Sequence, residues 1–225
     1  MKITDKYTFF WKSKLGQWNK LPFVDENNIK YNCAEQYMMA KKALLFNDKE
    51  IYEEIMNEDN PAIHQKLGRK VKNFDLTLWN EKCENIVYQG NYYKFTQNKE
   101  LFDILMKTEN TIFVEASPYD LIWGVGLGEK DPLILDEKNW RGENLLGKTL
   151  TKLRDDLLKK ENNIDKFHYH EVIDRVNIIN SNMDEFVLNH PVIQNNNDLK
   201  QNVNEIIEKI GKLYQDLGYL SFKKN

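Results

Sequence analysis

The sequence contains little of what a disulfide-rich or metal-binding protein requires. Its 225 residues include two cysteines, Cys33 and Cys83, which stand far apart and outside any CxxC pair. A zinc centre needs three or four converging ligands, and the sequence contains no such cluster. We therefore expect no metal site, no cofactor, and two buried free thiols in a reducing compartment.

Long apolar runs, a signal-peptide pattern and an excess of one charge are also absent. Without the first two, we expect a cytoplasmic protein that makes no membrane contact. The net charge of −3, from 32 basic and 35 acidic residues, gives no general attraction to nucleic acid. It still allows a local basic groove, whose candidates are Lys12, Lys14, Arg69, Lys70 and Lys72.

The chain does contain enough apolar material for a core, with 41% hydrophobic and 12% aromatic residues. Its length fits one domain with an appendage. The polar run Glu161-Asn162-Asn163 predicts a boundary between a domain at residues 1–160 and an extension at residues 161–225. Within the extension, an apolar-periodic segment at 164–188 precedes an amphipathic helix at 199–217.

Capping residues predict where several helices of the domain begin. Asn32-Cys33-Ala34-Glu35 opens a helix with a broad apolar face, and Asn60-Pro61 places an N-cap before a proline at the first helical position. Asp75 is the expected N-cap of a long helix. Short strands and loops are expected over residues 1–31, a strand at 111–114, and a helix at 144–160.

The segment VEASPYDLIWGVGLG, residues 114–128, is the most informative part of the chain. It combines two acids, Glu115 and Asp120, with Trp123 and a glycine-rich loop that begins at Gly124. A carboxylate, a flat stacking surface and backbone N–H groups open to phosphate suit a nucleotide or a ribose phosphate. A structural turn that buries Trp123 is the alternative interpretation.

A second informative segment is AEQYMMAKKALLF, residues 34–46. Glu35 and Lys42 are seven positions apart and therefore share one helix face with Met38 and Met39. An acid and an amine on an apolar stripe are costly to bury unless they are paired or functional. The alternative is that Glu35 is a first-turn helix acid and that Lys42 extends to solvent.

Three further segments carry candidate binding residues. Arg69 lies near Trp79 in sequence and would hold a diphosphate while the indole stacks on a base. Asn91, in the run GNYYKF, is a candidate for a pocket wall, and Arg141 is a candidate phosphate ligand. The alternative interpretations are that Arg69 lies on a solvated basic face and that Trp79 is a core residue. For the other two, the run with Asn91 would merely end a helix, and Arg141 would form an ion pair with a carboxylate.

Six segments, in this order, resemble the NADAR superfamily (NAD- and ADP-ribose-associated), and within it the YbiA-like N-glycosidases. They are FFW, YNCAEQYMMAKKALLF, LGRKVKNFD with the following Trp79-Asn80, GNYYKFTQN, VEASPYDLIWGVGLG and WRGENLLGKTL. They span residues 7–158, so the tail from about residue 162 lies outside the resemblance. The segment at residues 11–18 departs from the pattern, since related proteins tend to carry glycines and a Phe-Ser pair there.

The resemblance implies an α+β fold, a helix-rich single domain with a small β-sheet, followed here by a helical C-terminal extension. It implies an enzyme that hydrolyses the N-glycosidic bond between a ribose phosphate and a nitrogen base. Two substrate classes are known in the family. One is the early riboflavin-pathway intermediates, which are ribosylaminopyrimidine phosphates. The other is ADP-ribose on guanine in nucleic acid, removed as an antidote to an ADP-ribosyltransferase toxin.

This chemistry gives the candidate residues their expected roles. Glu35 and Asp120 would stabilise the cationic sugar or protonate the leaving base. Lys42 would engage C1′ as a Schiff base, or the bond would be hydrolysed directly. Trp79 and Trp123 would flank the base. Substrate binding would also involve Gly124 and a set of polar residues, namely Arg69, Asn91 and Arg141.

Two other functions compete with catalysis. One is a non-catalytic ADP-ribose-binding module, which would keep the aromatic and basic residues but has no use for the two acids and the lysine. The other is a partner-binding protein whose C-terminal helices do the work. In that case the extension would bind a second copy of the chain or a toxin.

Overall fold

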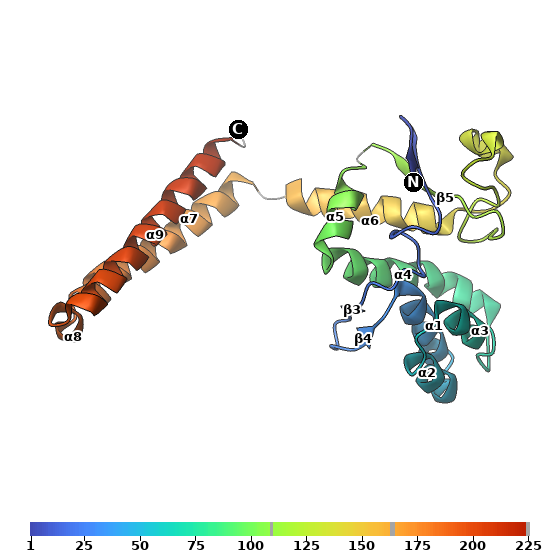
Figure 1. The fold of residues 1–225 in the computed structure, drawn as a ribbon, viewed down its shortest axis with the longest axis horizontal. Helices are drawn as coiled ribbons and strands as arrows, with labels where there is room; N and C mark the ends of the chain where they lie inside the picture. Colours follow the sequence, from blue (N-terminus) through green and yellow to red (C-terminus); the bar gives the residue numbers. More distant parts are fainter. Residues whose placement is uncertain (109, 163–164, 224–225) are drawn as a thin grey trace. The chain divides into compact units, whose positions relative to one another are not determined.

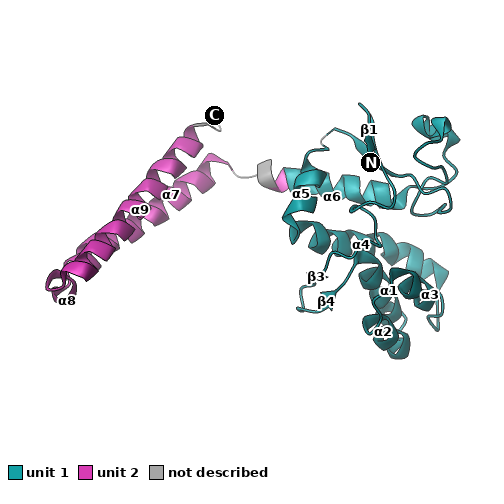
Figure 2. Ribbon diagram, viewed as in Figure 1, with its two compact units in different colours: residues 1–158 teal, residues 159–225 magenta. Residues whose placement is uncertain are grey.

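The computed structural model describes residues 1–108, 110–162 and 165–223. The chain forms two compact units, residues 1–158 and residues 159–225, which are coloured separately in Figure 2. Among the helices of the described residues, none has both the length and the apolar character needed to cross a membrane.

A three-stranded sheet in the first unit fixes where the functional segments begin. Strand β2 (Tyr7–Phe10) pairs antiparallel with β1 (Lys2–Ile3) and parallel with β5 (Ile112–Glu115). Because β2 and β5 are parallel, with Phe10 opposite Glu115, the segments that follow them leave the sheet at the same edge. Residues 11–19 and 116–123 therefore start side by side, although about 100 positions separate them in sequence.

Among the described residues, the α-helices of this unit are α1 (Ala34–Leu45), α2 (Lys49–Met56), α3 (Pro61–Gly68), α4 (Leu76–Thr96), α5 (Lys99–Met106) and α6 (Leu145–Asn162), the last of which continues past Leu158. A two-stranded sheet, β3 (Phe23–Val24) with β4 (Lys30–Tyr31), precedes α1. The two predicted caps are confirmed: the Asn60 amide oxygen accepts from Ala62 N–H, and the Asp75 carboxylate from Leu78 N–H. The helix that was expected to open at residues 32–35 has Cys33 as its N-cap, whose thiol accepts from Gln36 N–H. Single-turn 3-10 helices occupy Pro132–Leu135 and Glu137–Asn139.

Buried side chains form two cores on either side of the sheet segment. The larger core joins Phe10 and Phe113 to apolar residues of α1, α4 and α6. The smaller core packs Phe9 and Val114, from the opposite face of the sheet, against Ile134 and Val125. Every side chain of β2 is buried, as expected for a strand covered on both faces.

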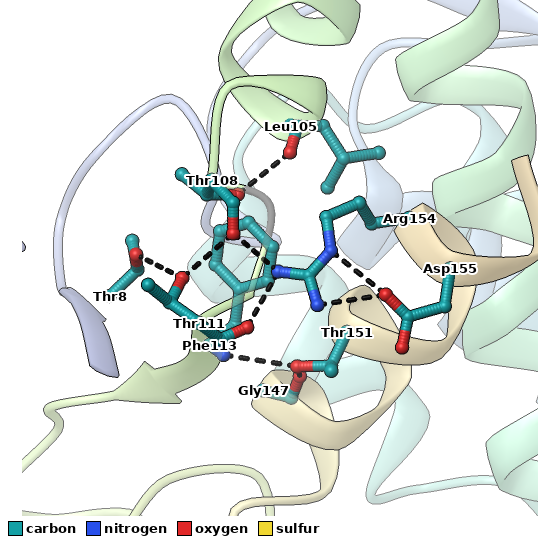
Figure 3. Close-up of polar contacts among 9 residues, drawn as sticks. All are labelled: Thr8, Leu105, Thr108, Thr111, Phe113, Gly147, Thr151, Arg154 and Asp155. Carbon is teal, nitrogen blue, oxygen red and sulfur yellow. Dashed lines mark hydrogen bonds and ion pairs between the residues drawn. The ribbon is translucent and has the colours of Figure 1, made fainter. Parts of the chain in front are cut away.

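Arg154 of α6 anchors the chain that enters β5 (Figure 3). Its guanidinium is buried and donates from Nη1 to the carbonyls of Thr108 and Thr111, at 2.7 and 2.6 Å. Nε and Nη2 bind the Asp155 carboxylate at 2.9 and 2.8 Å. Thr151, one turn earlier on α6, accepts from Phe113 N–H. These contacts hold β5, and so Glu115 at its end, against α6.

The second unit is a helical hairpin. Helix α7 (Lys166–Asn182) continues as a π-helical turn (Met183–Leu188), and after the short α8 (Pro191–Gln194) the chain returns as α9 (Asn197–Lys223). Helices α7 and α9 pack along each other in opposite directions (Figure 1). Two expected elements, the segment at 164–188 and the helix at 199–217, occupy these two arms.

The predicted fold class is confirmed: a helix-rich α+β unit with small sheets is followed by a helical C-terminal part. The expected boundary at residues 160 and 161 falls within the last turns of α6, which runs to Asn162. The two compact units divide slightly earlier, between Leu158 and Lys159. Asn163, in the polar run that suggested the boundary, lies outside the described residues.

Candidate active site

A cavity of about 970 Å³ opens in the first unit, at the edge where β2 and β5 end. Its walls come from four parts of the chain: the loop at residues 11–19, one face of α1, residues 65–79 with parts of α3 and α4, and the segment at residues 115–123. This volume is at the upper end of the range usual for small-molecule sites.

Helix α1 supplies one wall through four residues at helical spacing. Glu35, Met38, Met39 and Lys42 all line the cavity, as their shared helix face predicts. Glu35 is only 5% exposed, and its own N–H donates to the carbonyl of Gln17 at 3.1 Å. The first turn of α1 is thereby attached to the loop on the opposite wall.

Two carboxyl groups in this cavity hold their protons more tightly than usual. Burial raises the pKa of Glu35 from 4.5 to about 7; the negative charge of Asp120 adds to the rise, whereas a hydrogen bond from Trp18 and the charge of Arg69 oppose it. Burial raises the pKa of Glu115 to about 8, helped by the charges of Asp120 and Glu35. Near neutral pH, the site therefore retains carboxylic acid protons that it can donate.

Lys42 lies on the same helix face, and its amine is partly desolvated. The Nζ atom stands 4.3 Å from the ring centre of Phe74 and 5.2 Å from that of Trp79. Burial lowers the pKa of Lys42, and the positive charge of Arg69 lowers it further. Both effects increase the fraction of neutral amine, which is the nucleophilic form.

Asp120 and Trp123 are positioned by a tight turn after β5. The Oδ1 atom of Asp120 accepts from the N–H groups of Ile122 and Trp123, at 2.9 and 2.8 Å. Both Asp120 and Trp123 line the cavity. Further along, Gly126 has φ +69°, a left-handed conformation that favours glycine and lets the loop turn back toward Arg141.

The loop at residues 11–19 is fixed from behind by two residues of α4. Asn91 donates from Nδ2 to Oε1 of Gln17 at 3.0 Å. Lys94 donates from Nζ to the carbonyls of Leu15 and Gly16, at 3.2 and 2.8 Å. Lys94 is fully buried, and that burial lowers its pKa to about 7. Asn91 and Lys94 thus shape the cavity wall without lining it.

The structure brings six of the nine predicted site residues to one cavity: Glu35, Lys42, Arg69, Trp79, Asp120 and Trp123. The other three, Asn91, Gly124 and Arg141, are not among its lining residues. A Cβ on Gly124 would lie 2.9 Å from Cβ of Ser117 and 3.0 Å from the carbonyl of Glu115, so this glycine is needed for packing. Arg141 is exposed, and its N–H donates to the carbonyl of Val125.

Sequence reasoning did not assign several of the lining residues. Glu115 was noted as an acid but given no role. It is the last residue of β5, and the negative charges of Asp120 and Glu35 help to raise its pKa. Trp11, Trp18 and Tyr119 add aromatic surface, and the Trp11 and Tyr119 rings approach to 6.5 Å. The departure of residues 11–18 from the family pattern had drawn attention to this loop, and the structure shows that it lines the cavity.

Comparisons with known proteins agree with the resemblance drawn from the motifs. Residues 7–158 match the NADAR domain. N-glycosidase R617 of Acanthamoeba polyphaga mimivirus is 42% identical over 165 residues, which is 68% of this chain and 97% of that protein. The maize riboflavin biosynthesis protein PYRR, chloroplastic, is 29% identical over 62% of this chain, which corresponds to 22% of its own length.

A solved structure shows the same fold. The NMR structure of Escherichia coli YbiA superimposes with a TM-score of 0.59 at 23% identity, over 72% of this chain and 90% of that one. The expectation of an enzyme that hydrolyses N-glycosyl compounds agrees with the names of the relatives. The family match covers well over half of the chain, and the chain therefore belongs to the NADAR domain family.

Proposed function

We propose that this protein hydrolyses the bond between C1′ of a ribose phosphate and the nitrogen of a base, and that the reaction takes place in the cavity between α1 and β5. One observation carries the proposal. Two carboxyl groups with raised pKa, the buried Glu35 and the half-buried Glu115, and one lysine with lowered pKa line the same cavity. Separating pKa values in this way is typical of sites that move protons.

Cleavage of an N-glycosidic bond needs a proton donor and a stabiliser of positive charge. As the C1′–N bond breaks, its electron pair leaves with the base, and the nitrogen takes a proton from a carboxylic acid. Glu35 and Glu115 are suited to donate it because both pKa values lie near neutrality. Asp120, whose position is fixed by two backbone N–H groups, supplies negative charge beside the cationic sugar.

Lys42 is the proposed nucleophile. Its neutral amine adds to C1′ while the base departs with the C1′–N electrons and a proton from a carboxylic acid. The amine nitrogen then loses a proton and forms a double bond to C1′ as the C1′–O4′ bond breaks, and O4′ takes a proton to give a Schiff base with the opened sugar. Water then adds to C1′ and releases the lysine. The aromatic rings of Phe74 and Trp79 beside Nζ keep the amine in a partly dry environment that lowers its pKa.

For the substrate, we favour a ribosylaminopyrimidine phosphate of the early riboflavin pathway. The maize relative that matches this chain is named a riboflavin biosynthesis protein. Trp79 and Trp123 offer flat surfaces for the base, and Arg69 provides a cation for the phosphate at the exposed side of the cavity. Of the five basic residues proposed for a nucleic-acid groove, Lys14 and Lys72 are instead ion-paired with Glu100 and Glu50.

One observation favours ADP-ribosyl-guanine as a second candidate substrate. The cavity volume of about 970 Å³ exceeds the needs of a single ribosyl base, and its rim carries Trp18 at 49% and Tyr119 at 87% exposure. Exposed aromatic rings of this kind stack on bases. Lys12, which also lines the cavity, would face a phosphate.

Trapping of the covalent intermediate tests the proposal. Borohydride added during turnover should reduce the Schiff base and increase the protein mass by that of one reduced sugar phosphate, located by peptide mass spectrometry on Lys42. Lys42→Ala should lose both the adduct and the activity. Lys41→Ala is the matched control, because Lys41 is its neighbour, forms an ion pair with Asp25 and does not line the cavity. Full activity of Lys42→Ala would refute the lysine route.

A further inference from the structure

The helical hairpin at residues 165–223 leaves a regular part of its apolar surface uncovered. On α9, the apolar positions Leu199, Val203, Ile206, Ile210, Leu213, Leu217 and Leu220 alternate at spacings of four and three. This is the seven-residue pattern of a helix that packs against others. In the structure, alternate members of this series differ in exposure.

One half of the pattern closes the hairpin. Val203 is 7% exposed, Ile210 and Leu217 are half-buried, and all three lie on the side of α9 that packs against α7. On α7 the matching position is Val176, at 8% exposure, with Ile173 beside it. The contact between the two arms therefore covers this side of each helix, where Ile207 of α9 and Tyr169 of α7 are also half-buried, and leaves the other half of the pattern without a neighbour within the hairpin.

The other half of the pattern is exposed. On α9 the row comprises Leu199, Ile206, Leu213 and Leu220, with exposures of 39, 44, 49 and 46%. On α7 and the turn that follows it, the row comprises Val172, Ile179 and Phe186, with exposures of 37, 53 and 64%. We call these seven residues the exposed row set. All seven are apolar, and within each arm they repeat at intervals of seven.

The two rows lie on the same side of the hairpin. On each helix the exposed residue comes three positions after a buried one, as Ile179 follows Val176 and Ile206 follows Val203. At 100° per residue the rows are offset by the same angle in the same sense from the hairpin contact. Because α7 and α9 run in opposite directions, equal offsets place both rows on one face.

We infer that this face binds the same face of a second copy of the chain, and that the two hairpins form a four-helix bundle. A helix with two adjacent apolar rows needs two neighbouring helices, and each arm of the hairpin has one. A second hairpin supplies the missing neighbour to both arms at once. A two-fold axis makes the match automatic in length and pattern, because residue for residue the two faces are the same.

The size of the face agrees with a stable dimer. Helix α9 contains 27 residues, which corresponds to a length of about 40 Å. Two helices about 10 Å apart give a face about 20 Å wide, and so about 800 Å² per chain. Specific protein–protein interfaces bury about 800 Å² per partner.

Light scattering during gel filtration of the full chain tests this inference. We expect twice the 26.8 kDa of one chain at micromolar concentration. The double variant Ile179→Glu, Ile206→Glu should have the mass of one chain, because it places charges in the centre of the interface. Ile178→Glu is the matched control: Ile178 is 57% exposed and adjacent to Ile179, but points away from α9, so the double mass should persist.

The outcomes are decisive even if the double variant loses helix content. In that case circular dichroism of the wild-type chain should show a helix melting temperature that rises with protein concentration, as dimer formation requires. A wild-type mass of one chain would overturn the inference, and would assign the face to the first unit or to a different protein. A double variant that stays dimeric and helical would also overturn it.

Discussion

Replacing Glu35 by glutamine is expected to stabilise the first unit at alkaline pH while removing activity. Burial raises the pKa of Glu35 in the folded protein from its ordinary value of 4.5 to about 7. The folded state therefore binds the proton more tightly than the unfolded state does. The contribution of Glu35 to the unfolding free energy is therefore greatest below pH 4.5, falls as the pH rises toward 7, and stays at the lower level above pH 7.

The size of the effect follows from the shift. The folded and unfolded pKa values differ by about 2.5, and one pKa unit corresponds to about 1.36 kcal/mol. Ionisation of Glu35 therefore lowers the unfolding free energy by about 3 kcal/mol above pH 7. Glutamine cannot ionise, so Glu35→Gln should avoid this loss. The gain should be near zero at about pH 4 and approach about 3 kcal/mol at about pH 8. The same substitution should also lower the pKa of Glu115, because it removes a neighbouring negative charge.

Urea unfolding followed by tryptophan fluorescence measures this gain. All five tryptophans lie within residues 1–158, so the signal reports the first unit alone. Glu54→Gln, at an exposed position on α2, is the matched control and should show no pH-dependent gain. Equal effects of Glu35→Gln at acid and alkaline pH, or a destabilisation at alkaline pH, would refute the reasoning.

Three further predictions concern the support of the site and its pH dependence. Lys94→Met should raise KM and lower the unfolding free energy by about 1–3 kcal/mol, because two carbonyls of the 11–19 loop lose their donor. Steady-state kinetics measures the first effect and urea unfolding the second. An unchanged KM would contradict the role of Lys94 in holding this loop. Arg154→Ala should destabilise the first unit by about 3 kcal/mol, whereas exposed Lys148→Ala should be neutral in the same unfolding experiment. The rate should fall above about pH 7 as Glu35 loses its proton, and a rate that rises steadily to alkaline pH would exclude Glu35 as the acid.

Local signals in the sequence predicted much of the first unit. Asn60-Pro61 and Asp75 mark helix starts because their side chains satisfy backbone N–H groups within three residues, and such contacts need no distant partner. Glu35 and Lys42 were predicted to share one helix face for the same reason, since a single helix fixes their relation, and both line the cavity.

Residues that depend on distant contacts could not be placed in this way. The parallel pairing of β2 with β5 brings Trp18 and Glu115 to one cavity, and nothing local in either segment specifies that pairing. Asn91 was expected to touch the substrate, but it lies behind the wall, where it holds Gln17. A buried lysine such as Lys94 has partners 78 and 79 residues earlier in the chain, beyond the reach of a periodicity argument.

A paired glycosidase assay tests the central claim most directly. Wild-type protein and Asp120→Asn would each be offered a ribosylaminopyrimidine phosphate and guanine-ADP-ribosylated DNA. Asparagine keeps the oxygen that accepts from Ile122 and Trp123 but removes the charge. The account predicts release of the sugar phosphate or of ADP-ribose by the wild type, and a loss of at least about 100-fold in the variant. Binding of either substrate without any release by the wild-type protein would contradict it, and would make the cavity a non-catalytic ADP-ribose-binding site.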